Sequence, residues 1–267
     1  MEKLQAAIER ARAQREDRPA PRRSASAPSA APASWSALAP MSTDPSTLSK
    51  NRIFVNSDGR DSAAFDILRT KMFQICREND WKRVVITSPT MGCGKTTTCC
   101  NLATSFARQS DRRVIVFDMD FRRPSISRYM GQSGGTEFAK VLSGEVDFAD
   151  QARLFSPNVA MAINYSSAEN PSKLIMQDST ADILSDIEAR YKPELMIFDT
   201  PPVLVTDDTI AFLKMVDAAL IVVGSEISSL DDVDACEKEV AEHTNVMGTV
   251  LNRCRYATES YGYQFGY

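Results

Sequence analysis

The sequence predicts an α/β fold in which a doubly wound, mostly parallel sheet has helices on both faces. Short apolar runs alternate along the chain with longer segments of helical periodicity, the order expected of strand–helix–strand units. Each run is apolar at almost every position, as in strands that are buried on both faces. The predicted strands span residues 83–88, 114–118, 159–163, 194–199, 218–223 and 246–252. A ligand site is therefore expected at the carboxyl ends of these strands.

The helices between the strands are predicted from apolar periodicity. Residues 62–78 are expected to form the first helix, because Phe65, Leu68 and Met72 fall on one face. A second helix is expected to begin directly after the glycine-containing loop that follows the first strand. Right-handed crossovers through such helices make the strands parallel.

Four segments are predicted along the chain. Residues 1–16 are expected to form a short amphipathic helix, which is marginal in water on its own. Residues 17–50 are rich in Pro, Ala and Ser and are interpreted as a disordered linker, because such a segment buries little apolar surface. Residues 51–252 form the predicted folded domain, and residues 253–267 a flexible, tyrosine-rich tail.

The composition excludes several classes of function. The formal net charge of −4 lacks the dense basic surface that a nucleic-acid partner needs, so no nucleic acid is expected. The six cysteines contain no CxxC pair and His243 is the one histidine, which argues against a zinc site. We interpret the cysteines as reduced thiols of a cytosolic protein. No apolar run approaches the ~18 residues of a membrane span, so membrane association is expected only through a partner.

The loop after the first predicted strand, SPTMGCGKTTT at residues 88–98, has the pattern of a phosphate-binding loop, with Pro89 at the motif's first glycine. Glycines let backbone N–H groups surround phosphate oxygens, and the following helix points its positive dipole end at the same anion. Lys95 would add a positive charge near the β and γ phosphates, and the Thr96 hydroxyl would ligate Mg²⁺. A purely structural turn is the alternative. The predicted nucleotide-binding residues of this loop are Gly92, Cys93, Gly94, Lys95, Thr96 and Thr97.

Three aspartates follow two of the predicted strands. Asp118 and Asp120 come at the end of one strand, and Asp199 ends another, so all three are expected beside the phosphate-binding loop. Carboxylate oxygens suit Mg²⁺, and phosphoryl transfer also needs a base for the acceptor's proton. The alternative is that each aspartate caps a helix. Arg122 is expected either to contact phosphate or to pair with a neighbouring carboxylate.

Four of the seven tyrosines lie in the last twelve residues, among Gly, Ser, Thr and Gln residues that do not build a core. They are Tyr256, Tyr261, Tyr263 and Tyr267. On a flexible tail they would be accessible phosphoacceptors, and each phosphate would add a charge of ~−1.5 to −2. An inert aromatic tail is the alternative interpretation.

Together these motifs resemble those of the bacterial tyrosine kinases of capsular and exopolysaccharide synthesis, the BY-kinases, over residues 51–267. The matching sequences are the phosphate-binding loop, DMDFRRP at 118–124, NPSKL at 170–174, FDTPPV at 198–203 and the terminal tyrosine cluster. The resemblance implies a P-loop NTPase fold of the deviant Min/Par-like class. It also implies an ATP- and Mg²⁺-dependent protein-tyrosine kinase that phosphorylates its C-terminal tyrosines in trans within a ring of subunits.

The resemblance further implies partners and a location. The expected activator is a membrane polysaccharide co-polymerase that controls chain length, and a cognate tyrosine phosphatase is expected to reverse the modification. The chain would then be cytoplasmic and held at the inner face of the plasma membrane by its partner. The implied role is regulation of exopolysaccharide or capsule synthesis and export.

Roles for individual residues also follow from the resemblance. The implied catalytic residues are Lys95, Asp118, Asp120 and Asp199. Thr96 and the three aspartates are expected to hold Mg²⁺, with one aspartate acting as base, and Asn252 is expected to contact the adenine. The family's assembly motif, EAFRxLRT, corresponds to residues 63–70, where its Glu and first Arg are absent and Arg69 remains.

Two other functions remain open at this stage. A partitioning or positioning ATPase of the Min/Par type would share the loop, but such proteins usually carry a lysine where this chain has Thr90. The second alternative is a scaffold whose nucleotide site only regulates docking to an export complex. The intact Lys95 and aspartates argue against this alternative. Labelled ATP separates the three, because they yield phosphotyrosine, free phosphate or neither product.

Overall fold

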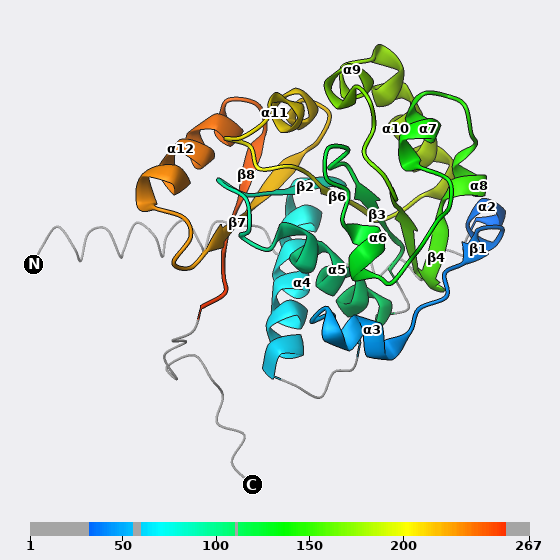
Figure 1. Ribbon diagram of the computed structural model, residues 1–267, viewed down its shortest axis with the longest axis horizontal. Helices are drawn as coiled ribbons and strands as arrows, with labels where there is room; N and C mark the ends of the chain where they lie inside the picture. The colour runs from blue at the N-terminus through cyan, green and yellow to red at the C-terminus, as the bar shows by residue number, and fades with distance from the viewer. Residues whose placement is uncertain (1–31, 56–59, 110–111, 255–267) are drawn as a thin grey trace, which may run out of the picture. The chain divides into compact units, whose positions relative to one another are not determined.

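A computed structural model describes residues 32–55, 60–109 and 112–254 (Figure 1). These residues contain one sheet with the strand order β1-β4-β5-β3-β6-β2-β7-β8. Neighbouring strands are parallel except for the antiparallel pair β4 and β5. The strands are β1 (Ala39–Pro40), β2 (Arg83–Thr87), β3 (Val114–Asp118), β4 (Arg153–Ser156), β5 (Val159–Ala162), β6 (Leu195–Asp199), β7 (Ala218–Gly224) and β8 (Asn245–Asn252). The predicted mostly parallel sheet is confirmed.

Helices cover both faces of this sheet, so the doubly wound arrangement is also confirmed (Figure 1). One face packs against α3 (Pro45–Lys50), α4 (Arg60–Asn79), α5 (Lys95–Ala107) and α6 (Ile126–Tyr129). The other face packs against α2 (Ala33–Ser36), α7 (Phe138–Leu142), α8 (Phe148–Gln151), α9 (Pro171–Ile175), α10 (Asp178–Tyr191), α11 (Asp207–Leu213) and α12 (Leu230–Ala241). The helix predicted at residues 62–78 lies within α4.

The central strands divide their side chains between two hydrophobic cores. In β3, Val114 and Val116 join the core beneath α4 and α5, whereas Ile115 and Phe117 join the core on the opposite face. All four are fully buried. Because side chains alternate along a strand, burial on both faces requires a continuous apolar run.

The prediction of a disordered linker at residues 17–50 is wrong for its described part, residues 32–50. Trp35 is 1% exposed in the core, and its indole Nε1 donates a hydrogen bond to the carbonyl oxygen of Pro157 at 2.9 Å. β1 pairs in parallel with β4, and Asp44 caps α3 through the backbone N–H groups of Ser46 and Thr47. A few large apolar side chains therefore order this segment, although Pro, Ala and Ser dominate its composition.

Several predictions fall on residues outside the described ranges. These are the helix at 1–16, the first part of the linker at 17–31 and the tail from residue 255 onward. Among the residues that are described, no helix combines the length and the apolar character that crossing a bilayer requires.

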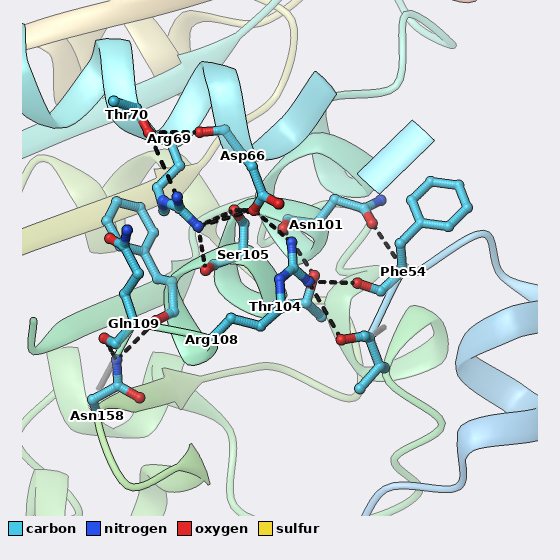
Figure 2. Close-up of polar contacts among 12 residues, drawn as sticks. Phe54, Asp66, Arg69, Thr70, Asn101, Thr104, Ser105, Arg108, Gln109 and Asn158 are labelled. Atoms are coloured by element: carbon cyan, nitrogen blue, oxygen red, sulfur yellow. Dashed lines mark hydrogen bonds and ion pairs between the residues drawn. The ribbon is translucent and has the colours of Figure 1, made fainter. Parts of the chain in front are cut away.

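A buried polar cluster joins α4 to α5 (Figure 2). Arg69 is 8% exposed and donates hydrogen bonds to Asp66 Oδ1 at 2.9 Å, to the Ser105 carbonyl oxygen at 2.9 Å and to Ser105 Oγ at 3.0 Å. Arg108 donates to the same carboxylate at 2.6 Å. Burial would raise the pKa of Asp66, but hydrogen bonds from Ser105 and Arg108 hold it below its usual value. The arginine retained from the assembly motif therefore points inward.

Candidate nucleotide-binding site

The phosphate-binding loop joins β2 to α5 at the carboxyl edge of the sheet. Gly92 and Gly94 have φ angles of 82° and 95°, a region that costs side-chain-bearing residues energy but suits glycine. Lys95 is the first residue of α5 and is only 9% exposed. The first turn of a thirteen-residue helix and a lysine therefore face the same loop, an arrangement that favours a phosphate group.

Two of the predicted aspartates lie side by side next to this loop. Asp118 and Asp199 end the neighbouring strands β3 and β6 and are partners in the strand register. The hydroxyl of Thr96, in the first turn of α5, donates a hydrogen bond to Asp199 Oδ2 at 2.6 Å. Ser125 Oγ lies 3.0 Å from the same hydroxyl, a contact that the sequence motifs did not indicate.

The paired aspartates form a buried acidic site. Both are at most 1% exposed. Burial, together with the negative charge of Asp199, raises the pKa of Asp118 well above its usual value. Burial also raises the pKa of Asp199, although the charge of Lys95 opposes the shift. Oδ1 of Asp199 is buried without a hydrogen-bond partner among the described residues. An unpaired carboxylate oxygen beside a second carboxylate and a hydroxyl is a donor set that fits Mg²⁺.

Asp120 lies further out than the other two aspartates. It is half-buried, and its Oδ1 accepts a hydrogen bond from the backbone N–H of Arg123 at 3.0 Å. Its own N–H donates to Asp118 Oδ1 at 3.3 Å. Burial raises the pKa of Asp120, while the charge of Lys95 opposes the shift. The carboxylate therefore lies near the lysine and is accessible from outside.

Arg122 pairs with a carboxylate that sequence reasoning did not identify. Its Nε and Nη2 donate to the two oxygens of Asp208 at 2.5 and 3.1 Å, and Nη2 also donates to Ser172 Oγ at 3.0 Å. Ser172 Oγ in turn donates to Asp208 at 2.6 Å. Ser172 belongs to the NPSKL motif, whereas Asp208 carried no signal in the sequence. A phosphate contact by Arg122 stays a prediction.

Asn252 lies at the end of β8, against the phosphate-binding loop. Its Nδ2 donates a hydrogen bond to the Cys93 carbonyl oxygen at 2.9 Å. Beside it is a cavity of about 1020 Å³ whose lining includes Gly94, Thr97 and Asn252, together with Phe54 of the loop after α3 and residues of α3, α4 and α6. The cavity is large enough for a nucleoside. A contact of Asn252 with the adenine stays a prediction.

Cys93 is fully buried and connects the phosphate-binding loop to the loop after β7. Its Sγ lies 3.3 Å from the Thr90 carbonyl oxygen and 3.4 Å from Ser228 Oγ. Sequence reasoning placed this residue beside the nucleotide, but its side chain points into the protein. Only its backbone therefore faces the loop interior.

The predicted acceptors Tyr256, Tyr261, Tyr263 and Tyr267 lie outside the described residues. The structure brings together the loop, Lys95, Thr96 and the aspartates, and it places Asn252 beside them. The fold and this site define the class of a P-loop nucleotide-binding domain. Residues 84–262 match the family described as the CobQ/CobB/MinD/ParA nucleotide binding domain, and the chain belongs to that family.

Curated proteins similar to this chain include several named tyrosine-protein kinases. The chain is 28% identical over 220 residues to the tyrosine-protein kinase etk of Escherichia coli, covering 80% of this chain and 30% of the relative. It is 25% identical over 207 residues to the tyrosine-protein kinase YwqD of Bacillus subtilis, covering 76% of this chain and 86% of the relative. The chain spans only 26% to 30% of the length of the longer curated relatives that it matches.

Among solved structures, a tyrosine-kinase domain superposes on this chain better than a MinD-type ATPase does. The kinase domain of the Escherichia coli tyrosine kinase ETK superposes with a TM-score of 0.66 at 26% identity, covering 76% of this chain and 80% of that domain. The cell division ATPase MinD of Pyrococcus furiosus shares the fold with a TM-score of 0.56 at 24% identity, covering 66% of this chain and 73% of that protein. The predicted resemblance to bacterial tyrosine kinases is therefore confirmed, and the MinD-type relatives are more distant.

Proposed function

We propose that this protein is an ATP-dependent protein-tyrosine kinase that phosphorylates the C-terminal tyrosine cluster of a second copy. The observation that carries the proposal is the buried pair Asp118 and Asp199 beside Thr96, directly at the start of the helix that bears Lys95. The tyrosine kinases among its relatives support the choice of acceptor. The four tyrosines within residues 253–267 would supply phenol acceptors in the same sequence.

In this proposal the nucleotide lies across the start of α5. Backbone N–H groups of residues 92–96 bind the β phosphate, and the ammonium group of Lys95 offsets charge on the β and γ oxygens. The adenosine lies in the cavity beside Gly94 and Thr97, where Asn252 can hydrogen-bond the base. Aligning the triphosphate in this way positions the γ phosphorus for an in-line attack.

Mg²⁺ would be held by Thr96, Asp118, Asp120 and Asp199. When bound, the ion offsets the charge that develops on the phosphate oxygens during transfer. Asp120 is the proposed base, because it is the aspartate that an incoming phenol can reach. The phenolic proton moves to Asp120 while the phenol oxygen bonds to the γ phosphorus, and the bond between that phosphorus and the β–γ bridging oxygen breaks so that ADP leaves.

The biological setting follows from the family resemblance. A membrane polysaccharide co-polymerase would activate the kinase and hold it at the inner face of the plasma membrane. Trans-phosphorylation requires self-association, and a cognate phosphatase would reset the tail. Each phosphate adds ~−1.5 to −2 charge, so a fully modified tail would outweigh the net charge of −4 and alter self-association. This change of charge is the proposed signal for exopolysaccharide or capsule synthesis and export.

Mass spectrometry of the tail after incubation with Mg·ATP tests the proposal, with the activator's cytoplasmic segment supplied. Phosphotyrosine within residues 253–267 is expected for the wild type and not for Lys95→Met. Free phosphate without phosphotyrosine would instead indicate an ATPase switch of the Min/Par type. Neither product, from a protein that still binds ATP, would indicate a scaffold.

A further inference from the structure

Exposed apolar side chains gather at the edge of the sheet that carries the phosphate-binding loop. Among the described residues, nine large apolar side chains are exposed, and five of them lie at this edge, four on three loops and one at the start of α12. We call these five the apolar rim. They are Met91, Leu204, Val205, Ile227 and Leu230. More than half of these exposed apolar side chains therefore belong to one edge of the sheet, and exposed apolar surface that gathers in one region typically marks an interaction site.

The topology of the sheet makes these three loops neighbours. Strands β6, β2 and β7 lie next to one another and run parallel, so the loops after them meet at one edge. The backbone N–H of Val203 donates to the Ser88 carbonyl oxygen at 3.0 Å, which joins the loop after β6 to the phosphate-binding loop. The contact of Cys93 with Ser228 joins that loop to the loop after β7. The apolar rim thus flanks the phosphate-binding loop on both sides.

Local structure fixes the outward position of the most exposed member of the rim. Leu230 is 84% exposed and is the first residue of α12. A capping box fixes this helix start, because Ser229 Oγ accepts from the Asp232 N–H at 3.1 Å and the Asp232 side chain accepts from the Ser229 N–H at 3.1 Å. A leucine held outward by a well-formed cap is pre-ordered for a partner, so little entropy is lost on contact.

The C-terminal segment of the chain has an aromatic pattern that suits such a surface. Tyr261, Tyr263, Phe265 and Tyr267 occupy alternate positions, with Gly262, Gln264 and Gly266 between them. In an extended chain, alternate side chains fall on one face. Phe265 has no hydroxyl and cannot accept a phosphate, yet it keeps the alternation. The property that these four positions share is therefore an aromatic ring, and not a hydroxyl group that can accept phosphate.

We propose that the apolar rim binds the aromatic face of residues 261–267 from a second copy, with the segment extended across the phosphate-binding loop. The inference rests on the proposed kinase function and assigns its acceptor-docking surface. Binding several rings in alternation would place one tyrosine near Lys95 while the others contact the rim. The substrate class is then a tyrosine with a second aromatic residue two positions away.

Charged side chains of both signs border the apolar rim. Asp207 and Asp231 are exposed beside Val205 and Leu230, but Asp207 lies 3.7 Å from Arg122, and Arg123 Nη1 donates to Met91 Sδ at 3.4 Å. A strongly charged partner of either sign would therefore be repelled by part of this border. Residues 255–267 carry one arginine and one glutamate, so the segment is close to neutral and meets no such repulsion. Contacts of Met91 with aromatic rings add a favourable sulfur–aromatic interaction.

The test measures docking separately from phosphoryl transfer. A fluorescent peptide of residues 255–267 is titrated with the full chain carrying Lys95→Met, and its anisotropy is recorded. Leu230→Ser is expected to raise the Kd of the peptide about tenfold. Leu230 is largely exposed in the free chain and would be buried by the bound peptide, so the substitution removes that apolar contact from the complex. Ile67→Ser is the matched control, because Ile67 is an exposed apolar residue of α4 that does not belong to the rim, and it is expected to leave the Kd unchanged. In the peptide, Phe265→Ala is expected to weaken binding about tenfold and Phe265→Leu by less than about threefold.

The kinase readout distinguishes the two proposals. With the active full chain, Leu230→Ser and the Phe265→Ala peptide are expected to raise the KM for peptide and leave kcat nearly unchanged. Peptide binding that depends on Leu230, without phosphotyrosine in any tail, would contradict the kinase function and retain the docking surface. Tail phosphorylation that is indifferent to both changes would overturn the docking surface alone.

Two further outcomes name other occupants. An autophosphorylation rate that is independent of protein concentration would mean that the rim binds the chain's own tail, which overturns trans docking. Weaker self-association of Leu230→Ser on sedimentation, with an unchanged peptide Kd, would mean that the rim binds the folded surface of a second copy and would overturn docking of the tail. The expected result is an autophosphorylation rate that rises with protein concentration, together with a peptide Kd that Leu230→Ser raises.

Discussion

Gly94 occupies a position where an added methyl group has two separate costs. Its φ of 95° lies in the left-handed region, where a residue with a side chain loses about 1–2 kcal/mol. A Cβ at this position would also overlap Nδ2 of Asn252. Asn252 would have to move and would lose its hydrogen bond to the Cys93 carbonyl oxygen, which is worth about 0.5–1.5 kcal/mol.

Gly92 is the matched control for this substitution. Its φ of 82° is similar, but an added Cβ would meet no atom within 4 Å. Gly92→Ala therefore carries the backbone cost alone, and the loop relaxes away from the conformation that binds phosphate. At about 1.4 kcal/mol per tenfold, we expect ADP binding to weaken by about 5- to 30-fold. Gly94→Ala should weaken it by roughly a further 2- to 12-fold.

Isothermal titration with ADP measures these effects without turnover, and a third variant isolates the overlap. In a protein that already carries Asn252→Ala, Gly94→Ala should cost only as much as Gly92→Ala, because the atom it would overlap is gone. Denaturant unfolding checks that each variant is folded. Equal losses for the two glycine variants, or a Gly94→Ala loss that Asn252→Ala does not reduce, would refute the reasoning.

Three further predictions test the fold and the site. Trp35→Ala should lower the free energy of unfolding by about 3–5 kcal/mol, because the indole is buried; a loss below about 1 kcal/mol in urea would contradict an ordered segment at residues 32–50. Asp66→Ala should cost about 1–3 kcal/mol in the same assay, since it leaves Arg69 buried without its carboxylate, whereas exposed Asp61→Ala should cost little. Asp199→Asn should remove the strengthening of ADP binding by Mg²⁺ and retain binding in EDTA, as measured by titration with and without the ion; a Mg²⁺ effect equal to that of the wild type would contradict the proposed ligand role.

Much of the fold could be predicted because the central strands are buried on both faces. β3 and β6 are fully buried, so their sequences are continuously apolar and are visible without any knowledge of their neighbours. β4 is different, because all four of its residues are only partly buried, and its sequence RLFS shows no period. The strand forms because β5 and β1 pair with it, which is tertiary information.

The ordered segment at residues 32–50 was missed for a related reason. Its contribution to the core rests on a few residues, among them Trp35, Leu38 and Leu48, which are separated by Pro, Ser and Ala. Average composition over such a window resembles that of a linker. The indole hydrogen bond to Pro157 spans 122 positions, so no local pattern could reveal it.

At the site, the residues that belong to local motifs could be predicted, whereas partners that are distant in the sequence could not. The loop and the aspartates at strand ends were visible because the fold itself positions them. Asp208 was not, since its pairing with Arg122 spans 86 positions and joins the start of α11 to the loop after β3. The sequence therefore allowed a carboxylate partner for Arg122, and the structure identifies that partner as Asp208.

In the segment that corresponds to the assembly motif, the sequence also did not reveal what its retained arginine contacts. Arg69 stands where the family has an arginine, but Asp66 stands where the family has another arginine, so the charge at that position is reversed. The reversal gives both Arg69 and Arg108 an internal partner, and Arg69 is consequently buried (Figure 2). A guanidinium that already donates to a carboxylate, a carbonyl and a hydroxyl would have to break those bonds before it could reach another subunit. Self-association of this chain, which the proposed trans reaction requires, must therefore use surface other than Arg69.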